Sequence, residues 1–197
     1  MFPSVLTTLV TDELDFPNLS MVGVDDRAAA YTAVDYLIRQ GHRKIAVLGG
    51  PVTSYPSLMR RQGAQQAMED AGIVFNDKLY GLSNYDFESA YHAMNSLLAR
   101  RAEFTALFAM SDVIAFGAIR ALVSAGLRVP EDVSVIGFDG ITMSRYCVPV
   151  MTTIVQPSEQ IALQSIELLV RQIEHGSPAQ TVTLQPELQQ GESVRAI

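Results

Sequence analysis

Short apolar runs alternate with amphipathic stretches along this chain, which is the pattern of repeated βα units. The apolar runs are rich in β-branched and aromatic residues, which favours buried strands of a parallel sheet. Most amphipathic stretches carry apolar residues at helical spacing and end near a glycine, a frequent helix stop. The predicted strands are 21–24, 44–48, 79–82, 104–109, 133–138 and 152–155, the predicted helices are 27–40, 57–71, 86–100, 112–125 and 158–175, and 181–184 is extended.

This order of elements predicts an α/β fold with a doubly wound parallel sheet, because parallel strands need a crossover helix between them. Composition agrees with a packed core, since 48% of the 197 residues are hydrophobic and 18% are charged. The chain has no internal repeat, low-complexity tract or charge block that would mark a linker. One α/β body is therefore the simplest interpretation.

Charge and targeting signals narrow the possible partners and location. The net charge is −7 and no lysine or arginine precedes Arg27, so we expect these residues to make no direct contact with DNA. No apolar run reaches the roughly 18 residues of a membrane span, and no basic region precedes the apolar N-terminal residues. Cys147 is the single cysteine and cannot form an internal disulfide. We expect a cytoplasmic protein with no membrane partner.

Polar side chains follow several of the predicted strands. In open parallel sheets, ligands bind beyond the carboxyl ends of the strands. The residues found there include a cation, carboxylates, an amide, a hydroxyl and two phenols, a set that suits a polyhydroxyl or heterocyclic ligand. The candidate ligand-binding residues are Tyr55, Arg60, Tyr85, Ser111, Asp112, Asp139 and Gln156.

Each candidate also has a purely structural interpretation. Ser111 and Asp112 both lie where a helix N-cap is needed, and capping is favoured for Asp112. Only one of Arg60 and Arg61 can point toward a ligand, so at least one of them is a solvated helix residue. Asp139 could serve turn geometry as readily as ligand contact. Each tyrosine could be an ordinary boundary aromatic residue.

Enzyme motifs are missing from the sequence. There is no phosphate-binding G-x-x-x-x-G-K-[ST] loop and no G-x-S-x-G elbow, and the segment GGPVTS at 49–54 lacks the third glycine of a dinucleotide loop. His42, His92 and His175 lack the paired spacing of a metal site. We expect no catalytic residue, no cofactor and no metal, although a doubly wound enzyme stays open as an alternative.

Two segments carry a family resemblance. The sequences GHRKIAVLGGP at 41–51 and GLRVPEDVSVIGFD at 126–139 resemble hallmark segments of the LacI/GalR family of bacterial transcription repressors. The second segment is highly specific, and the likeness extends from about residue 21 to the C-terminus. A sugar-binding protein of the periplasmic transport type would share the fold, but the missing signal peptide and the second segment argue against it.

The resemblance implies an effector-binding core of periplasmic-binding-protein type I, in which two Rossmann-like subdomains close like a hinge on a sugar or other small metabolite. It also implies a homodimer, and DNA contact only through a helix-turn-helix segment that this chain lacks. The effector-contacting positions of the family fall on Arg60, Tyr85, Asp139 and Gln156. Ser111 stands where many relatives carry asparagine, which suggests a different effector.

The resemblance also divides the chain into parts. Residues 1–24 and 156–175 would be a remnant of the N-terminal subdomain, 25–153 the C-terminal effector-binding subdomain, and 176–197 an extended C-terminal segment. The chain would then begin near the end of the first subdomain. We expect it to bind effector weakly, because one wall of the cleft would be missing. We also expect it to self-associate through exposed apolar surface on the remnant of the first subdomain, in addition to the dimerisation that the resemblance implies.

Overall fold

The computed structural model describes residues 4–6, 19–101 and 103–197. Within these residues the larger of two sheets contains six strands. The first five strands, in spatial order, are parallel to one another. Val47 illustrates the register, since it lies opposite Tyr80 on one side and Phe108 on the other. In spatial order the strands are β4 (Tyr80–Leu82), β3 (Ile45–Gly49), β5 (Ala106–Ala109), β6 (Ser134–Asp139), β7 (Thr152–Val155) and the antiparallel β9 (Glu187–Gln189).

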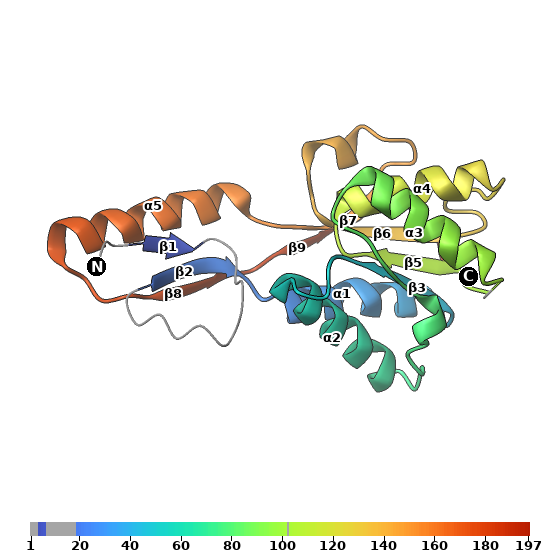
Figure 1. Cartoon of the computed structure of the whole chain (residues 1–197), viewed down its shortest axis with the longest axis horizontal. Helices are drawn as coiled ribbons and strands as arrows, with labels where there is room; N and C mark the ends of the chain where they lie inside the picture. Colours follow the sequence, from blue (N-terminus) through green and yellow to red (C-terminus); the bar gives the residue numbers. More distant parts are fainter. Residues whose placement is uncertain (1–3, 7–18, 102) are drawn as a thin grey trace.

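Helices cover both faces of this sheet (Figure 1). On one face lie α1 (Asp26–Arg39) and α2 (Tyr55–Asp70), and on the other lie α3 (Phe87–Ala99) and α4 (Asp112–Ser124). The strands between them are almost entirely buried, as parallel strands covered on both faces must be. The predicted doubly wound α/β fold is confirmed.

The two helices of the first face approach each other closely at Gly63. A Cβ atom at this position would lie 2.0 Å from the backbone oxygen of Arg27 in α1, a distance that no side chain could accept. Glycine therefore allows the backbones of α1 and α2 to touch, and this contact holds the start of α1 beside α2.

A smaller sheet lies beside the larger one (Figure 1). It consists of β1 (Ser4–Leu6), β2 (Leu19–Val24) and β8 (Thr181–Leu184), which are parallel, and α5 (Ser158–His175) packs along it. The chain passes between the two sheets three times, after β2, after β7 and after β8. Among the described helices, none combines the length and apolar character needed to span a bilayer.

The predicted strands and helices are all present, with ends that move by at most two residues. The structure adds the short strands β1 and β9 and two 3-10 helices, η1 (Asp77–Leu79) and η2 (Thr142–Arg145). These elements have three or four residues, which is too short for hydrophobic periodicity to reveal.

Candidate functional site

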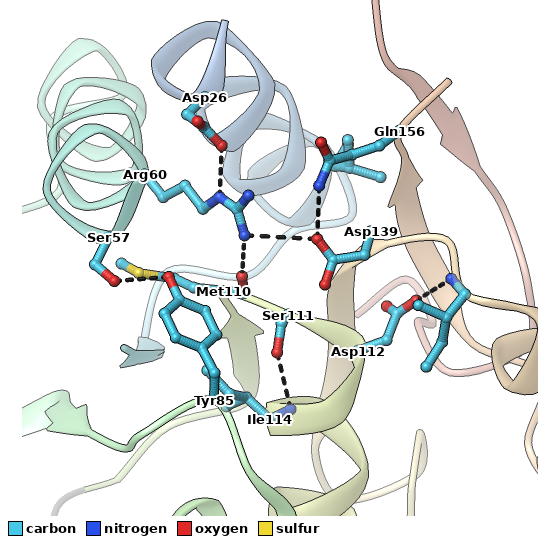
Figure 2. Close-up of polar contacts among 12 residues, drawn as sticks. Asp26, Ser57, Arg60, Tyr85, Met110, Ser111, Asp112, Ile114, Asp139 and Gln156 are labelled. Carbon is cyan, nitrogen blue, oxygen red and sulfur yellow. Dashed lines mark hydrogen bonds and ion pairs between the residues drawn. The ribbon is translucent and has the colours of Figure 1, made fainter. Parts of the chain in front are cut away.

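Arg60 is a buried cation on the inner face of α2. Its Nε donates a hydrogen bond of 2.7 Å to Oδ1 of Asp26, and its Nη1 donates to the backbone oxygen of Met110 (Figure 2). The guanidinium carbon lies 3.6 Å from the centroid of the Phe138 ring, a cation–π contact. These contacts come from α1, β6 and the residue after β5, so they fix both the position and the orientation of the guanidinium group.

The local sequence explains why an arginine lies here. The buried residues of α2 follow helical spacing and are otherwise small or apolar, apart from Ser57. Arg60 occupies this inner stripe near the start of the helix, where α2 meets the carboxyl ends of the strands. At that edge the side chain can reach polar partners, whereas deeper in the core it would have none.

Asp139 ends β6 and faces Arg60. Its Oδ1 accepts a hydrogen bond of 2.8 Å from Nε2 of Gln156 and lies 3.7 Å from Nη1 of Arg60. Burial raises the pKa of Asp139, while Arg60 and Gln156 act in the opposite direction. The backbone of Asp139 has a φ of 111°, an unusual value for a residue with a side chain and one that is often found at functional sites.

Tyr85 lies next to Ser57, near the Arg60 side chain (Figure 2). Its hydroxyl is 2.6 Å from the hydroxyl of Ser57, which shares the inner face of α2 with Arg60. Its φ is 60°, again in the left-handed region. The ring packs against Gly50, where an added Cβ would lie 2.0 Å from Cε2 of Tyr85. The ring of Tyr85 is therefore held in place before any ligand arrives.

Ser111 and Asp112 have different roles at the start of α4. Ser111 is the N-cap, because its Oγ accepts a hydrogen bond of 3.1 Å from the backbone N–H of Ile114. Asp112 is fully buried and accepts hydrogen bonds of 2.6 Å from the Thr153 hydroxyl and 2.9 Å from the Ile141 N–H. The preference for Asp112 as the N-cap was wrong. Burial raises the pKa of Asp112 to about 6.

Three of the predicted residues meet in one connected group. We call Asp26, Arg60, Asp139 and Gln156 the Arg60 cluster, since hydrogen bonds and ion pairs link all four (Figure 2). The other predicted residues have further contacts of their own, and the backbone N–H of Asp112 also donates a hydrogen bond to the Asp139 carboxylate. Tyr85 contacts Ser57, Ser111 caps α4, Asp112 binds Thr153 and Ile141, and the half-buried Tyr55 begins α2.

Of the two neighbouring arginines, Arg61 is the one that points away from the Arg60 cluster and has a structural role. Its guanidinium carbon lies 4.5 Å from the centroid of the Tyr80 ring, and its Nη2 is 3.1 Å from Oδ1 of Asp77. Arg60 alone of this pair reaches the carboxyl ends of the strands.

Asp26 was missed by the sequence analysis. It follows β2 by two residues, so the rule that selected the other strand ends would have found it had it been applied to the strand at 21–24. Asp26 also shows that the Arg60 cluster lies near the junction of the two sheets. It comes directly after the first passage of the chain from the smaller sheet to the larger one. Gln156 lies at the start of the second passage.

The Arg60 cluster offers hydrogen-bond acceptors and donors at the junction of the two sheets. The side chains of Arg60, Asp26 and Asp139 are 7%, 12% and 27% exposed, so a ligand reaches mainly Asp139. Within the part of the chain that the structure describes, no three histidine, cysteine, aspartate or glutamate residues are grouped as a metal site would need. The arrangement can bind a polar ligand through directed hydrogen bonds.

Comparisons with known proteins place this chain in a family. Residues 34–194 match the model of the periplasmic binding protein-like domain. The transcriptional repressor PurR of Histophilus somni (strain 129Pt) is 35% identical over 181 residues, which are 91% of this chain and 54% of that repressor. The chain spans about half the length of the curated relatives it matches.

Solved structures agree with this match. The complex of the transcriptional regulator CelR with cellobiose has a TM-score of 0.90 at 32% identity, and the likeness covers 96% of this chain and 58% of CelR. A sugar-binding LacI-family regulator from Escherichia coli in complex with phosphate has a TM-score of 0.82 at 32% identity, covering 91% and 69% of the two chains. The resemblance of the two hallmark segments is thus confirmed, and the chain belongs to the LacI family of transcriptional regulators, within the periplasmic binding protein-like domains.

Proposed function

We propose that this chain is the effector-binding core of a LacI-type transcription repressor and that the Arg60 cluster contacts the effector. The observation that carries this proposal is the position of the cluster. Four polar side chains from α1, α2, β6 and the segment after β7 meet at the carboxyl ends of parallel strands, where the chain passes between the sheets. The bound sugar of CelR supports a small polar effector.

We propose that effector binding closes a hinge between two subdomains. We assign residues 1–24 and 156–175 to one subdomain and 25–153 to the other, with 176–197 running along both. An effector that binds the Arg60 cluster and the opposite subdomain together favours the closed orientation, because it makes its full set of contacts only there. Asp26 and Gln156 adjoin two of the three passages, so a contact at the cluster acts directly on the hinge.

The chain acts by binding rather than by catalysis in this proposal. The relatives compared above are transcriptional regulators. Tyr85, Ser111 and Tyr55 would border the effector, and Asp112 would support the loop that carries Asp139. The net charge of −7 disfavours direct contact of these 197 residues with DNA phosphates, so the proposal assigns DNA contact to residues outside this sequence.

We infer that the chain forms a homodimer through the segment that contains η2. Met143, Tyr146 and Val148 in this segment are 59%, 78% and 94% exposed, and we call these three residues the η2 surface. Large apolar side chains gathered on a surface favour association with a partner. The proposed partner is a second copy of the chain, because most soluble oligomers are symmetric and a two-fold dimer buries the same surface on both copies.

A thermal-shift measurement tests the proposed effector site. The chain would be heated with cellobiose, ribose, cytidine and adenine in turn, because a ligand that binds only the folded state raises the melting temperature. We expect at least one of them to do so. Asp139→Asn removes the charge, tolerates a positive φ and keeps the shape, so we expect it to abolish the shift but not folding.

An exposed substitution on α2, Glu69→Ala, is the matched control and should leave the ligand shift unchanged. A ligand that stabilises the wild-type chain and Asp139→Asn equally would contradict the proposed site. Loss of folding in Asp139→Asn would show instead that Asp139 serves the turn after β6.

A further inference from the structure

His42 is a buried histidine that the proposed effector site does not use. It lies in the first hallmark segment, between the end of α1 and the start of β3, and it is 1% exposed. The other two histidines of the chain, His92 and His175, have side chains that are 68% and 70% exposed. A buried imidazole needs partners for its nitrogens, because an unpaired polar group in the core is costly.

Both ring nitrogens of His42 have such a partner. Nε2 lies 3.1 Å from the backbone oxygen of Arg195, and Nδ1 lies 2.9 Å from the hydroxyl oxygen of Thr105. A carbonyl oxygen only accepts, so Nε2 donates to Arg195, and in the neutral ring Nδ1 then accepts from the Thr105 hydroxyl. The neutral imidazole therefore joins three segments that are far apart in the sequence.

Residues 194–197, which we call the strap, lie at the amino ends of the strands of the larger sheet. The backbone N–H of Arg195 donates to the hydroxyl of Ser134, the first residue of β6, at 3.1 Å. The backbone N–H of Ile197 donates to the carbonyl of Gln40, the C-cap of α1, at 2.9 Å. The strap thus contacts the sheet and the end of α1 at the edge opposite the Arg60 cluster.

Gly41 allows the strap to pass close to the backbone beside His42. Its φ is 98°, and an added Cβ atom would lie 2.4 Å from the backbone oxygen of Ile197. The first two residues of the hallmark segment therefore both serve the strap: Gly41 makes room for it, and His42 binds it.

Protonation of His42 opposes this arrangement. In the charged ring Nδ1 becomes a donor too, so the Thr105 hydroxyl can no longer donate to it. Burial lowers the pKa of His42, the hydrogen bond to the Arg195 carbonyl opposes this effect, and the charge of Arg195 lowers the pKa further. When the strap leaves, the ring reaches water and moves away from the charge of Arg195. Proton uptake and detachment of the strap therefore favour each other.

The other charged groups on the neighbouring segments have partners of their own. They are Lys44 with Glu103, Arg43 with the carbonyl of Ala71, and Asp132 with Arg128. Hydrogen bonds lower the pKa values of Glu103 and Asp132, so both carboxylates stay ionised at pH 5. Among the groups named here, a fall from pH 7.5 to pH 5 changes the charge of His42 alone.

We propose that the strap is a pH-sensitive contact: residues 194–197 stay bound while His42 is neutral and detach when its ring takes up a proton. This inference goes beyond the proposed function and does not depend on where an effector binds. His42 follows the end of α1, and the first residue of α1, Asp26, belongs to the Arg60 cluster. The strap therefore holds the opposite end of a helix that contributes to that cluster.

Amide hydrogen exchange of the wild-type chain, followed by NMR from pH 7.5 to pH 5, tests this proposal. Each rate is divided by that of an unstructured peptide at the same pH, which gives a protection factor. We expect the protection of the Arg195 and Ile197 amides to fall by up to about 30-fold at pH 5, because that pH is 1.5 units below the ordinary histidine pKa of 6.5. Constant protection over this range would overturn the proposal.

The amide of Met110 distinguishes local opening from unfolding of the whole body. It donates to the carbonyl of Leu48 within the larger sheet. At every pH, the amides of Arg195 and Ile197 should exchange faster than that of Met110, because the strap detaches while the sheet stays folded. Equal protection of all three amides would overturn the proposal, since the strap would then open only when the body unfolds.

His42→Gln separates protonation of this ring from other effects of acid. The glutamine Nε2 can still donate to the Arg195 carbonyl but does not titrate, so we expect equal protection of the strap at both pH values. His92→Gln is the matched control, because it removes an exposed histidine from α3, and it should keep the wild-type fall. An equal fall in wild type and His42→Gln would overturn the proposal, since another group would then be responsible.

The wild-type chain alone provides a second test, which holds even if His42→Gln does not fold. The ring signal of His42 reports its own protonation in the same samples. Protection of the strap should begin to fall near pH 6.5, the pKa of a histidine in water, and should level off once the ring signal shows that His42 is protonated. A fall that continues unchanged after His42 is fully protonated would contradict the proposal.

Discussion

Asp112 is a carboxylate that the fold buries without a cation. Thr153 and Ile141 donate hydrogen bonds to it, but burial dominates and raises its pKa from 3.8 to about 6. The folded state therefore binds a proton more tightly than the unfolded state between these two pH values. The contribution of Asp112 to the free energy of unfolding must fall as the pH rises through this range and remain low above it.

We predict that Asp112→Asn removes this pH dependence. Asparagine keeps an oxygen that accepts a hydrogen bond but cannot ionise. Between pH 4.5 and pH 7.5, the free energy of unfolding of Asp112→Asn relative to wild type should rise by about 2 kcal/mol, calculated from 1.36 kcal/mol per pKa unit. Urea unfolding at both pH values measures this.

The control for this prediction is Asp132→Asn. Hydrogen bonds from Arg128 lower the pKa of Asp132 to about 2, so Asp132 is ionised at both pH values and its replacement should shift stability equally at each. The account of Asp112 fails if Asp112→Asn and wild type have parallel pH profiles.

Part of the candidate site could be predicted residue by residue. Arg60, Asp139 and Gln156 were found because the carboxyl ends of parallel strands meet at one edge of a sheet. The role of Asp112 was missed because its partners, Thr153 and Ile141, are 41 and 29 residues away in the sequence. Local capping rules describe only neighbours within one helical turn.

At the scale of elements, the length of a helix or strand determined whether it could be predicted from the sequence. Helices of 13 residues or more have clear hydrophobic periodicity, and all five were predicted. The strand β9 has three residues, and it forms because Ile154 of β7 lies opposite Leu188 in an antiparallel pair. Such an edge strand depends on its neighbour and has no periodicity of its own.

The segment around η2 connects the site to the surface. Asp112 binds the N–H of Ile141, which is the N-cap of η2, and the exposed η2 surface follows within a few residues. A change at Asp139 can therefore reach this surface through Gly140 and Ile141. If the proposed effector site and homodimer hold, this short path would connect effector binding to association of two chains.

We predict that Tyr146→Asp weakens association of the chain. Tyr146 is 78% exposed, so a charge there should cost little folding stability but oppose burial in an interface. Sedimentation velocity at several protein concentrations should show a shift from dimer to monomer, with the melting temperature of the monomer unchanged.

Val74→Asp provides the comparison, because Val74 is 88% exposed and lies in the loop after α2. It should leave the sedimentation profile as in wild type. Equal association of the wild-type and Tyr146→Asp chains would exclude the η2 surface as the interface.

At the scale of the whole molecule, three connections of the described chain join the two sheets (Figure 1). Asp26 and Gln156 of the Arg60 cluster adjoin two of these connections in the sequence. The fold class was predictable because repeated βα units leave few alternatives. The pairing of β8 with β2 was not predictable, since these strands are separated by almost the whole chain. Long-range pairing of this kind leaves no local pattern in the sequence.

The central claim is that the Arg60 cluster binds the effector, and the NMR signal of the Arg60 Nε–H tests it most directly. This group donates to Asp26, so its signal reports any change in the cluster. Cellobiose, ribose and cytidine would be titrated into the chain, with the Nε–H of Arg128, bound to Asp132, as an internal reference. We predict that a ligand that binds moves the signals of Arg60 and the Gln156 side-chain amide and leaves that of Arg128 in place. A bound ligand that leaves both Arg60 and Gln156 unmoved would contradict the account.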